Sequence, residues 1–206
     1  MYWYHYLALA SLAICLAFSL HHMLRLIRLG KPFDYAKAAG KTNSAILYSF
    51  MGAMSPVKKE SAFLHMPTYA AGIIYHLGTF LAIFLYFLIL TQVTFPGILA
   101  YLLAGFFLFT GICGVGILIK RIVKSELRNL SSPDDYISNI LVTLFQLSTS
   151  LILLVQEALP GYFILASMLL LYFPVGKLKH AIYFFAARYH LGLFYGWRGV
   201  WPPKTL

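Results

Sequence analysis

Long apolar stretches dominate the pattern of hydrophobic and polar positions along the chain. Five of them are long enough to cross a membrane, since a crossing takes roughly 20 residues. No stretch alternates between apolar and polar residues, which argues against a β-barrel. Because a backbone in hydrocarbon must satisfy its own hydrogen bonds, helices remain. The pattern predicts an all-α integral membrane protein, a five-helix transmembrane bundle in a single membrane domain 1–206, with spans at about 6–24, 69–91, 97–119, 137–156 and 160–180.

Composition points the same way. The 206 residues are 61% hydrophobic and only 11% charged, whereas a soluble domain carries about 25% charged residues. This excludes a soluble globular domain, a disordered chain and a disulfide-stapled module. The two cysteines, Cys15 and Cys113, lie in apolar runs and outside any CxxC motif, which argues against zinc and cysteine-ligated iron–sulfur sites. Residues 1–6 contain no Lys or Arg, so they do not resemble a cleaved signal peptide.

The basic residues predict the orientation. All 16 Lys and Arg fall in the loop 25–68, in the connection 120–128 or in the region from Lys177 onward, and the turns 92–97 and 156–161 contain none. The positive-inside rule therefore places the N-terminus outside and the C-terminus in the cytoplasm. The net charge of +10 reflects this topology and contact with anionic lipid or an acidic partner, and we expect no nucleic-acid binding. The expected location is the cell (inner) membrane, as a multi-pass protein.

The loop 25–68 and the tail 181–206 are thus predicted to be cytoplasmic. The loop is the only long connection, and a loop of this length in a small protein is usually functional. Two interpretations remain open for it. It could lie on the lipid surface as an amphipathic segment, or it could form a docking surface for a soluble subunit.

Two histidines stand out because ionisable residues inside spans are costly and mark function. His76 falls about seven residues inside the second span, on the order of 10 Å below the inner interface at 1.5 Å per residue, and His180 lies at the inner end of the fifth. The two helices run in opposite directions, so both side chains can lie in the inner third of the bilayer. This is the arrangement that a b-type haem (heme b) with two axial histidine ligands to its iron requires. The chain has 7 histidines in all: His5, His21, His22, His65, His76, His180 and His190.

The neighbours of these two histidines fit a haem. Each has a glycine four residues before it, on the same helix face, where a porphyrin needs space; these are Gly72 and Gly176. Lys177 and Lys179 flank His180 and could pair with the haem propionates, as could Lys58 and Lys59 near the start of the second span. The alternative is two packing histidines whose N–H groups bond to backbone or hydroxyl oxygens, and spacing alone leaves both interpretations open.

The chain also resembles a known family. The residues Lys120-Arg121, Arg128, Asp135 and Gln146, followed by Tyr172-Phe173-Pro174-Val175-Gly176-Lys177-Leu178-Lys179-His180, resemble the end of span three through span five of the gamma subunit of respiratory nitrate reductase. The same family includes the cytochrome b subunits of heterodisulfide reductase and of the complex associated with dissimilatory sulfite reductase. The resemblance covers spans two to five, and the loop around 52–64 is closer to the sulfur-metabolism branch.

The resemblance implies a quinol-linked cytochrome b with haem ligands on helices two and five. His76 and His180 match the inner ligands. The outer ligands are missing, and Tyr86 and Tyr162 stand roughly in their place, so one cytoplasm-proximal haem is expected. A second haem between His65 and His190 is a less favoured variant.

The function expected from this resemblance is electron transfer between a menaquinone-like membrane quinone and a cytoplasmic iron–sulfur subunit, heterodisulfide reductase-like, within a respiratory complex. Candidate quinone contacts in the inner half are His65, Lys59 and Tyr75. Two alternatives are a cofactor-free membrane anchor of such a complex and a small transporter. A transporter is expected to bury charge near the midplane, and the interiors of the first four spans carry none.

Overall fold

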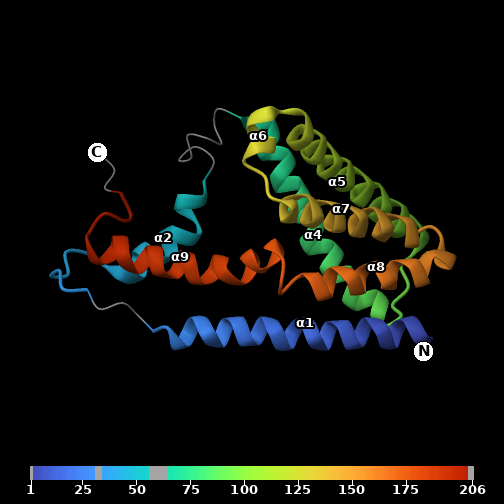
Figure 1. Cartoon of the computed structure of the whole chain (residues 1–206), viewed down its shortest axis with the longest axis horizontal. Coiled ribbons are helices and arrows are strands. Elements are labelled where there is room, and N and C mark those ends of the chain that lie inside the picture. Colours follow the sequence, from blue (N-terminus) through green and yellow to red (C-terminus); the bar gives the residue numbers. More distant parts are fainter. Residues whose placement is uncertain (1, 31–33, 56–64, 204–206) are drawn as a thin grey trace. The chain divides into compact units, whose positions relative to one another are not determined.

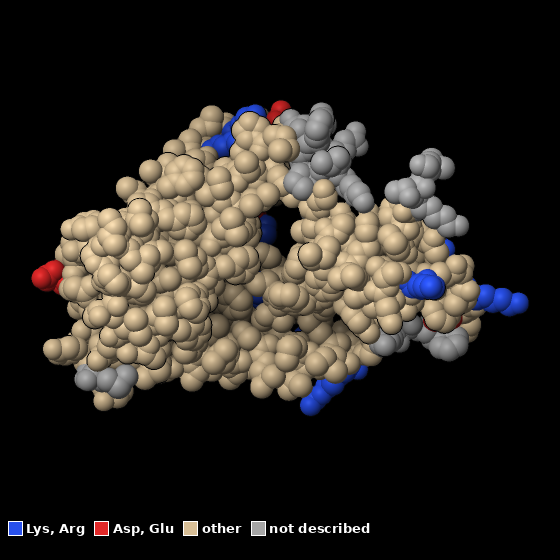
Figure 2. Space-filling view, turned by 180° about the vertical axis from the view of Figure 1, so that it is seen from behind, with Lys and Arg blue, Asp and Glu red and all other residues tan. Residues whose placement is uncertain are grey.

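The computed structural model describes residues 2–30, 34–55 and 65–203, and every regular element in these ranges is helical. Three helices are long and apolar enough to cross a membrane, namely α1 (Trp3–Arg28), α4 (Met66–Leu90) and α5 (Gly97–Val123) (Figure 1). A fourth span is counted if α8 (Leu159–Tyr172) and α9 (His180–Trp197) form one interrupted span. The all-α membrane character predicted from the sequence is therefore confirmed in this coarser form. Figure 2 shows a broad face made almost entirely of uncharged side chains.

The chain divides into two compact units. Unit 1 comprises Met1–Ala17 and Pro67–Leu178, and unit 2 comprises Phe18–Met66 and Lys179–Leu206. Unit 1 holds the first part of α1 together with α4, α5, α7, α8 and the short connecting helices α6 (Ser125–Asn129) and η3 (Gln156–Ala158). Unit 2 holds α2 (Thr42–Phe50), η1 (Gly52–Met54) and α9, and η4 (Lys177–Lys179) lies at the boundary.

Helix α7 (Pro133–Ile152) turns a polar face into unit 1. It begins with a capping box, in which Ser132 and Asp135 satisfy each other's backbone N–H groups, and with a proline in its first turn, both typical helix starts. Its 20 residues span about 30 Å. The buried residues Thr143, Gln146 and Ser150 recur at helical spacing, so the polar groups that lower its hydropathy lie against other helices rather than in lipid.

Glycines bring α4, α5 and α7 close together. A Cβ added at Gly78 would lie 2.6 Å from Gln146 Oε1, and one added at Gly111 would lie 2.5 Å from Leu147. At Gly114 it would collide with Tyr75 and Thr143. Small residues at such crossings let membrane helices approach closely, where packing and interhelical hydrogen bonds stabilise them.

The predicted span 160–180 is not one continuous helix, which corrects the sequence interpretation. Helix α8 ends at Tyr172, the short turn η4 follows, and α9 begins at His180. Pro174 lies in the break; it has no N–H to donate and its ring crowds the preceding turn. Beyond the break the chain is helical again as far as Trp197, so most of the predicted tail 181–206 forms α9.

In unit 2, α2 and α9 lie side by side (Figure 1). A Cβ at Gly192 would lie 2.5 Å from the Ile46 Cα, and one at Gly196 would lie 2.6 Å from the Ala45 Cβ, so both glycines are needed for this contact. Polar contacts hold the C-terminal end of α9. The Arg198 guanidinium donates to Asp34 at 2.6 Å, and the Trp197 indole N–H donates to the Ala36 carbonyl at 2.6 Å.

Candidate functional site

His76 occupies an exposed position in the third turn of α4, counted from the first residue of the helix, Met66. Its Nδ1 lies 2.7 Å from the Gly72 carbonyl oxygen. A carbonyl oxygen only accepts hydrogen bonds, so Nδ1 carries the proton and Nε2 keeps its lone pair. In the described part of the chain Nε2 has no partner. An N–H to a backbone carbonyl is the usual support for a histidine that binds a metal through its other nitrogen.

The space beside His76 is open. A Cβ added at Gly72 would meet no atom within 4 Å. The exposed residues on the same side of α4 are apolar: Ile73, Leu77 and Phe80 are 43%, 57% and 64% exposed. An imidazole lone pair on such a surface costs free energy unless something coordinates it or bonds to it. This part of α4 therefore has the polarity and the open face that one axial side of a haem requires.

His180, the other candidate ligand, is the first residue of α9 and is exposed. His76 belongs to unit 1 and His180 to unit 2. The predicted role of Gly176 needs correction, because residue 176 precedes the start of α9 and shares no helix face with His180. Gly176 is instead buried, and a Cβ there would overlap the ring of Tyr172.

Lys177 belongs to an ion cluster that the sequence analysis did not predict. Its ammonium contacts the Asp135 carboxylate, and the Arg121 guanidinium lies 3.4 Å from the same oxygen. The Ser132 backbone N–H donates to the other carboxylate oxygen at 2.9 Å. The hydrogen bond from Lys177 is the main reason that the pKa of Asp135 falls to about 2. Two cations on one carboxylate leave the cluster with a net positive charge. Lys179, the second predicted propionate partner, is half-buried in η4.

The candidate quinone contacts differ in their surroundings. The Tyr75 hydroxyl lies 2.9 Å from Thr143 Oγ1 and donates to the Asn139 carbonyl at 3.0 Å, so it links α4 to α7. His65 is exposed and directly precedes α4. Lys59, like Lys58, lies outside the described residues.

Gln146 of α7 makes a second link to α4. It is fully buried, and its Nε2 donates to the Tyr75 carbonyl at 3.1 Å and to Thr79 Oγ1 at 2.8 Å. Thr79 in turn donates to the Tyr75 carbonyl at 2.8 Å. A glutamine inside an apolar run is the sequence signal for such a contact, because a buried amide needs partners.

Aromatic rings fill the opposite half of unit 1. Tyr86 and Tyr162, at the level where outer haem ligands would be expected, are both buried, with ring centroids 6.5 Å apart. Tyr162 stacks on Phe145 at 5.6 Å, and Phe163 packs against Tyr86 at 6.2 Å. The Tyr86 hydroxyl donates to the Ala8 carbonyl of α1 at 3.2 Å. At this level the side chains form a packed core.

Within the described ranges, no three His, Cys, Asp or Glu side chains come together to hold a bare metal ion. A haem needs only two protein ligands, because the porphyrin supplies the other four nitrogens to the iron. Comparisons of the chain with protein-family models, with curated proteins and with solved structures gave no match.

Proposed function

We propose that this chain is a b-type cytochrome subunit that transfers electrons between a membrane quinone or quinol and a cytoplasmic iron–sulfur partner in a respiratory complex. The observation that carries the proposal is the state of His76: its Nδ1 proton is bound to Gly72, and its Nε2 lone pair faces outward from an apolar, uncovered helix surface. A histidine that only packed between helices would be buried and would use its nitrogens within the protein.

A bound haem supplies one-electron chemistry, because its iron changes between the ferric and ferrous states. His76 is proposed as one axial ligand and His180 as the other. Gly72 leaves room for the ring beside His76. Lys179 and the net positive cluster of Lys177, Arg121 and Asp135 favour carboxylates, and so support propionates directed toward the cytoplasm. We expect one haem per chain, since packed aromatic rings occupy the level of the missing outer ligands.

The proposal includes a finer topology of five spans, with the N-terminus outside and the C-terminus in the cytoplasm of the inner membrane. Helix α7 is long enough to be the fourth span, and its polar face is buried within unit 1. Residues 160–180, which contain most of α8 and the break after it, are proposed as the fifth. The basic inner segments favour anionic lipid and an acidic docking face on the iron–sulfur partner.

The quinone is proposed to be menaquinone-like and to approach from the inner half, near His65, Lys59 and Tyr75. Of these residues, Tyr75 is the best defined. Because its hydroxyl bridges to Thr143 and Asn139, a quinone oxygen would have to replace or share one of these bonds.

The test is a reduced-minus-oxidised absorption spectrum of the purified, full-length protein. We expect a low-spin b-type signal of about one haem per chain. His76→Ala and His180→Ala should each abolish it, while His21→Ala, which alters an exposed histidine of α1, should leave it unchanged. A stoichiometry near two would favour the variant with His65 and His190.

A second pair of variants separates loss of haem from loss of folding. At both Gly72 and Gly105 an added Cβ would meet nothing within 4 Å, so a larger side chain at either position begins in open space. Gly72→Phe should remove the haem signal because it fills the face beside His76, and Gly105→Phe on α5 should retain it. A folded, colourless wild-type protein would refute the cytochrome proposal and favour a cofactor-free anchor.

A further inference from the structure

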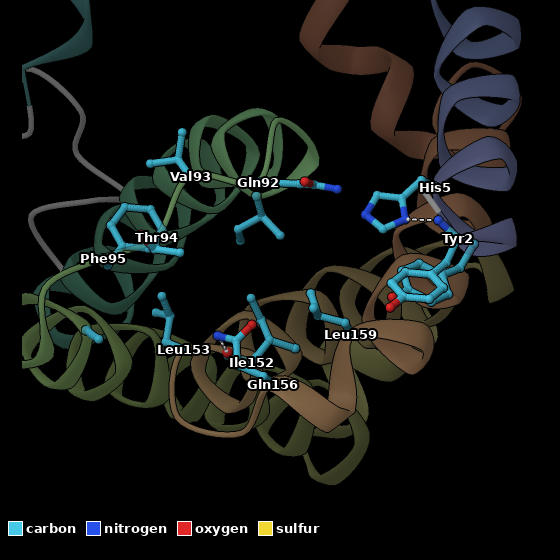
Figure 3. Close-up of a pocket in the computed structure, with 13 residues that line it drawn as sticks. Tyr2, His5, Gln92, Val93, Thr94, Phe95, Ile152, Leu153, Gln156 and Leu159 are labelled. Atoms are coloured by element: carbon cyan, nitrogen blue, oxygen red, sulfur yellow. Dashed lines mark hydrogen bonds between the residues drawn. The ribbon is translucent and has the colours of Figure 1, made fainter.

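A cavity of about 360 Å³ lies in unit 1, at the end opposite the basic residues of α5. It is formed by the start of α1, the end of α4 with the turn after it, and the end of α7 with the turn into α8 (Figure 3). The volume is in the range of pockets that bind small organic ligands. None of its 13 lining residues is Asp, Glu, Lys or Arg, so the cavity suits an uncharged ligand.

His5 supplies a defined hydrogen-bond donor to this cavity. The side chain is only 4% exposed, and its ring packs against Phe163 with centroids 5.0 Å apart. The Tyr2 backbone N–H donates to His5 Nδ1 at 3.2 Å. Because Nδ1 accepts this bond, the proton of the neutral ring is on Nε2. Figure 3 shows the other side of the ring directed into the cavity, and Nε2 has no protein partner in the described part of the chain.

Two glutamines add polar groups to apolar walls. Gln92 has a backbone φ of +63°, the left-handed conformation that ends α4 through the hydrogen bonds Val93 N–H to Leu88 and Gln92 N–H to Ile89. Its side chain points into the cavity (Figure 3). Gln156 also lines the cavity, and its side-chain amide donates to the Ile152 carbonyl at 3.1 Å. The remaining wall includes Ile89, Phe95 and Leu159.

We propose that this cavity is a binding site for an uncharged, largely apolar ligand whose carbonyl oxygen accepts a hydrogen bond from His5 Nε2–H. His5 is 4% exposed, so its free N–H has little access to water, and a ligand carbonyl would accept its hydrogen bond without bringing charge into the cavity. A quinone ring and the ester carbonyl of a neutral lipid share this chemistry. The inference does not depend on a haem, because the site is built from residues other than His76 and His180.

The test measures binding of two probes to the purified, full-length protein by equilibrium dialysis. Menadione represents the quinone ring and dioctanoylglycerol represents the neutral lipid ester. His5→Phe keeps a ring of similar size but removes the donor, and His5→Gln places an amide N–H near the position of Nε2. His21→Phe is the matched control on the same helix. A third compound, 1,4-dimethylnaphthalene, has the shape of menadione without its carbonyls.

We expect one probe to bind once per chain, with an affinity that falls at least about tenfold in His5→Phe. Affinity should stay within about threefold of wild type in His5→Gln and His21→Phe. The probe that behaves in this way identifies the source of the carbonyl. If neither probe binds, or if the bound probe is equally tight in His5→Phe, the proposal is overturned. Equal binding of menadione and 1,4-dimethylnaphthalene to the wild type would also overturn it for the quinone, even if His5→Phe did not fold.

Discussion

Replacing Gly78 by alanine should loosen the contact among α4, α5 and α7. The added Cβ would lie 2.6 Å from both Gln146 Oε1 and Thr110 Cβ, closer than unbonded atoms approach. Thr110 and Gln146 are both fully buried, so neither side chain can rotate away into lipid. The helices must separate, or Gln146 must give up its position.

The expected loss of stability follows from the hydrogen bonds that Gln146 makes and from the overpacking that the added Cβ causes. The two hydrogen bonds of Gln146, to the Tyr75 carbonyl and to Thr79, are worth about 0.6–1 kcal/mol each at a membrane helix contact. Overpacking adds about 1–3 kcal/mol, and the better helix propensity of alanine offsets up to about 1 kcal/mol. We therefore expect a net loss of about 1–5 kcal/mol in the free energy of unfolding.

Thermal unfolding in detergent, followed with a thiol-reactive dye, measures this loss directly. Cys15 is buried and Cys113 is partly buried, so both react faster once the helices part. Gly105→Ala and Gly116→Ala are the controls, because an added Cβ at either position meets nothing within 4 Å. They should unfold at or slightly above the wild-type temperature. If Gly78→Ala unfolded with them, the close packing described around Gln146 would be incorrect.

Two further predictions concern other parts of the chain. Asp135→Asn should cost about 1–2 kcal/mol of stability at neutral pH, a value reduced for the 53% exposed side chain of its partner Lys177. The pKa of Asp135 is lowered to about 2 in the folded protein, so the stability difference between Asp135→Asn and the wild type should be constant above about pH 4 and shrink as the pH falls toward 2. Unfolding temperatures of both proteins across this pH range measure the difference. A difference that did not change with pH would contradict the prediction. Gly192→Ala should separate α2 from α9, because the added Cβ would lie 2.5 Å from the Ile46 backbone, which cannot easily move aside. The expected loss in the free energy of unfolding is about 1–3 kcal/mol. Limited proteolysis should then cut in residues 34–55 faster than in the wild type or in Gly116→Ala, and unchanged cleavage would count against the contact.

The strongly apolar helices α1, α4 and α5 could be predicted from the sequence because their hydrophobic runs are longer than any alternative element needs. The break between α8 and α9 was also encoded locally, by Pro174 and Gly176. Hydropathy averaged over a whole span concealed it, because the residues on either side remain apolar. Lys177 could be predicted as an interfacial cation, but its partner Asp135 is 42 positions earlier and no local pattern reveals that pairing.

The candidate site shows the same division between local and long-range information. The position of His76 inside a predicted span marked it as functional, and Gly72 follows from the helical repeat. The tautomer of His76 depends on the backbone geometry of α4, so only the structure defines it. His5 lies near the end of an apolar run, where the sequence gives no sign that its side chain is buried. Its burial comes from Phe163, a residue far away in the sequence.

The polar inner face of α7 has a consequence for how the protein assembles. Thr143, Gln146 and Ser150 find their partners on α4 and α5, and alone in hydrocarbon an α7 segment would have to leave several of these groups unsatisfied. Entry of α7 into the bilayer is therefore tied to the prior presence of its two neighbours. In a newly made chain, α7 can therefore pack stably only after α4 and α5 have formed the surface that it contacts.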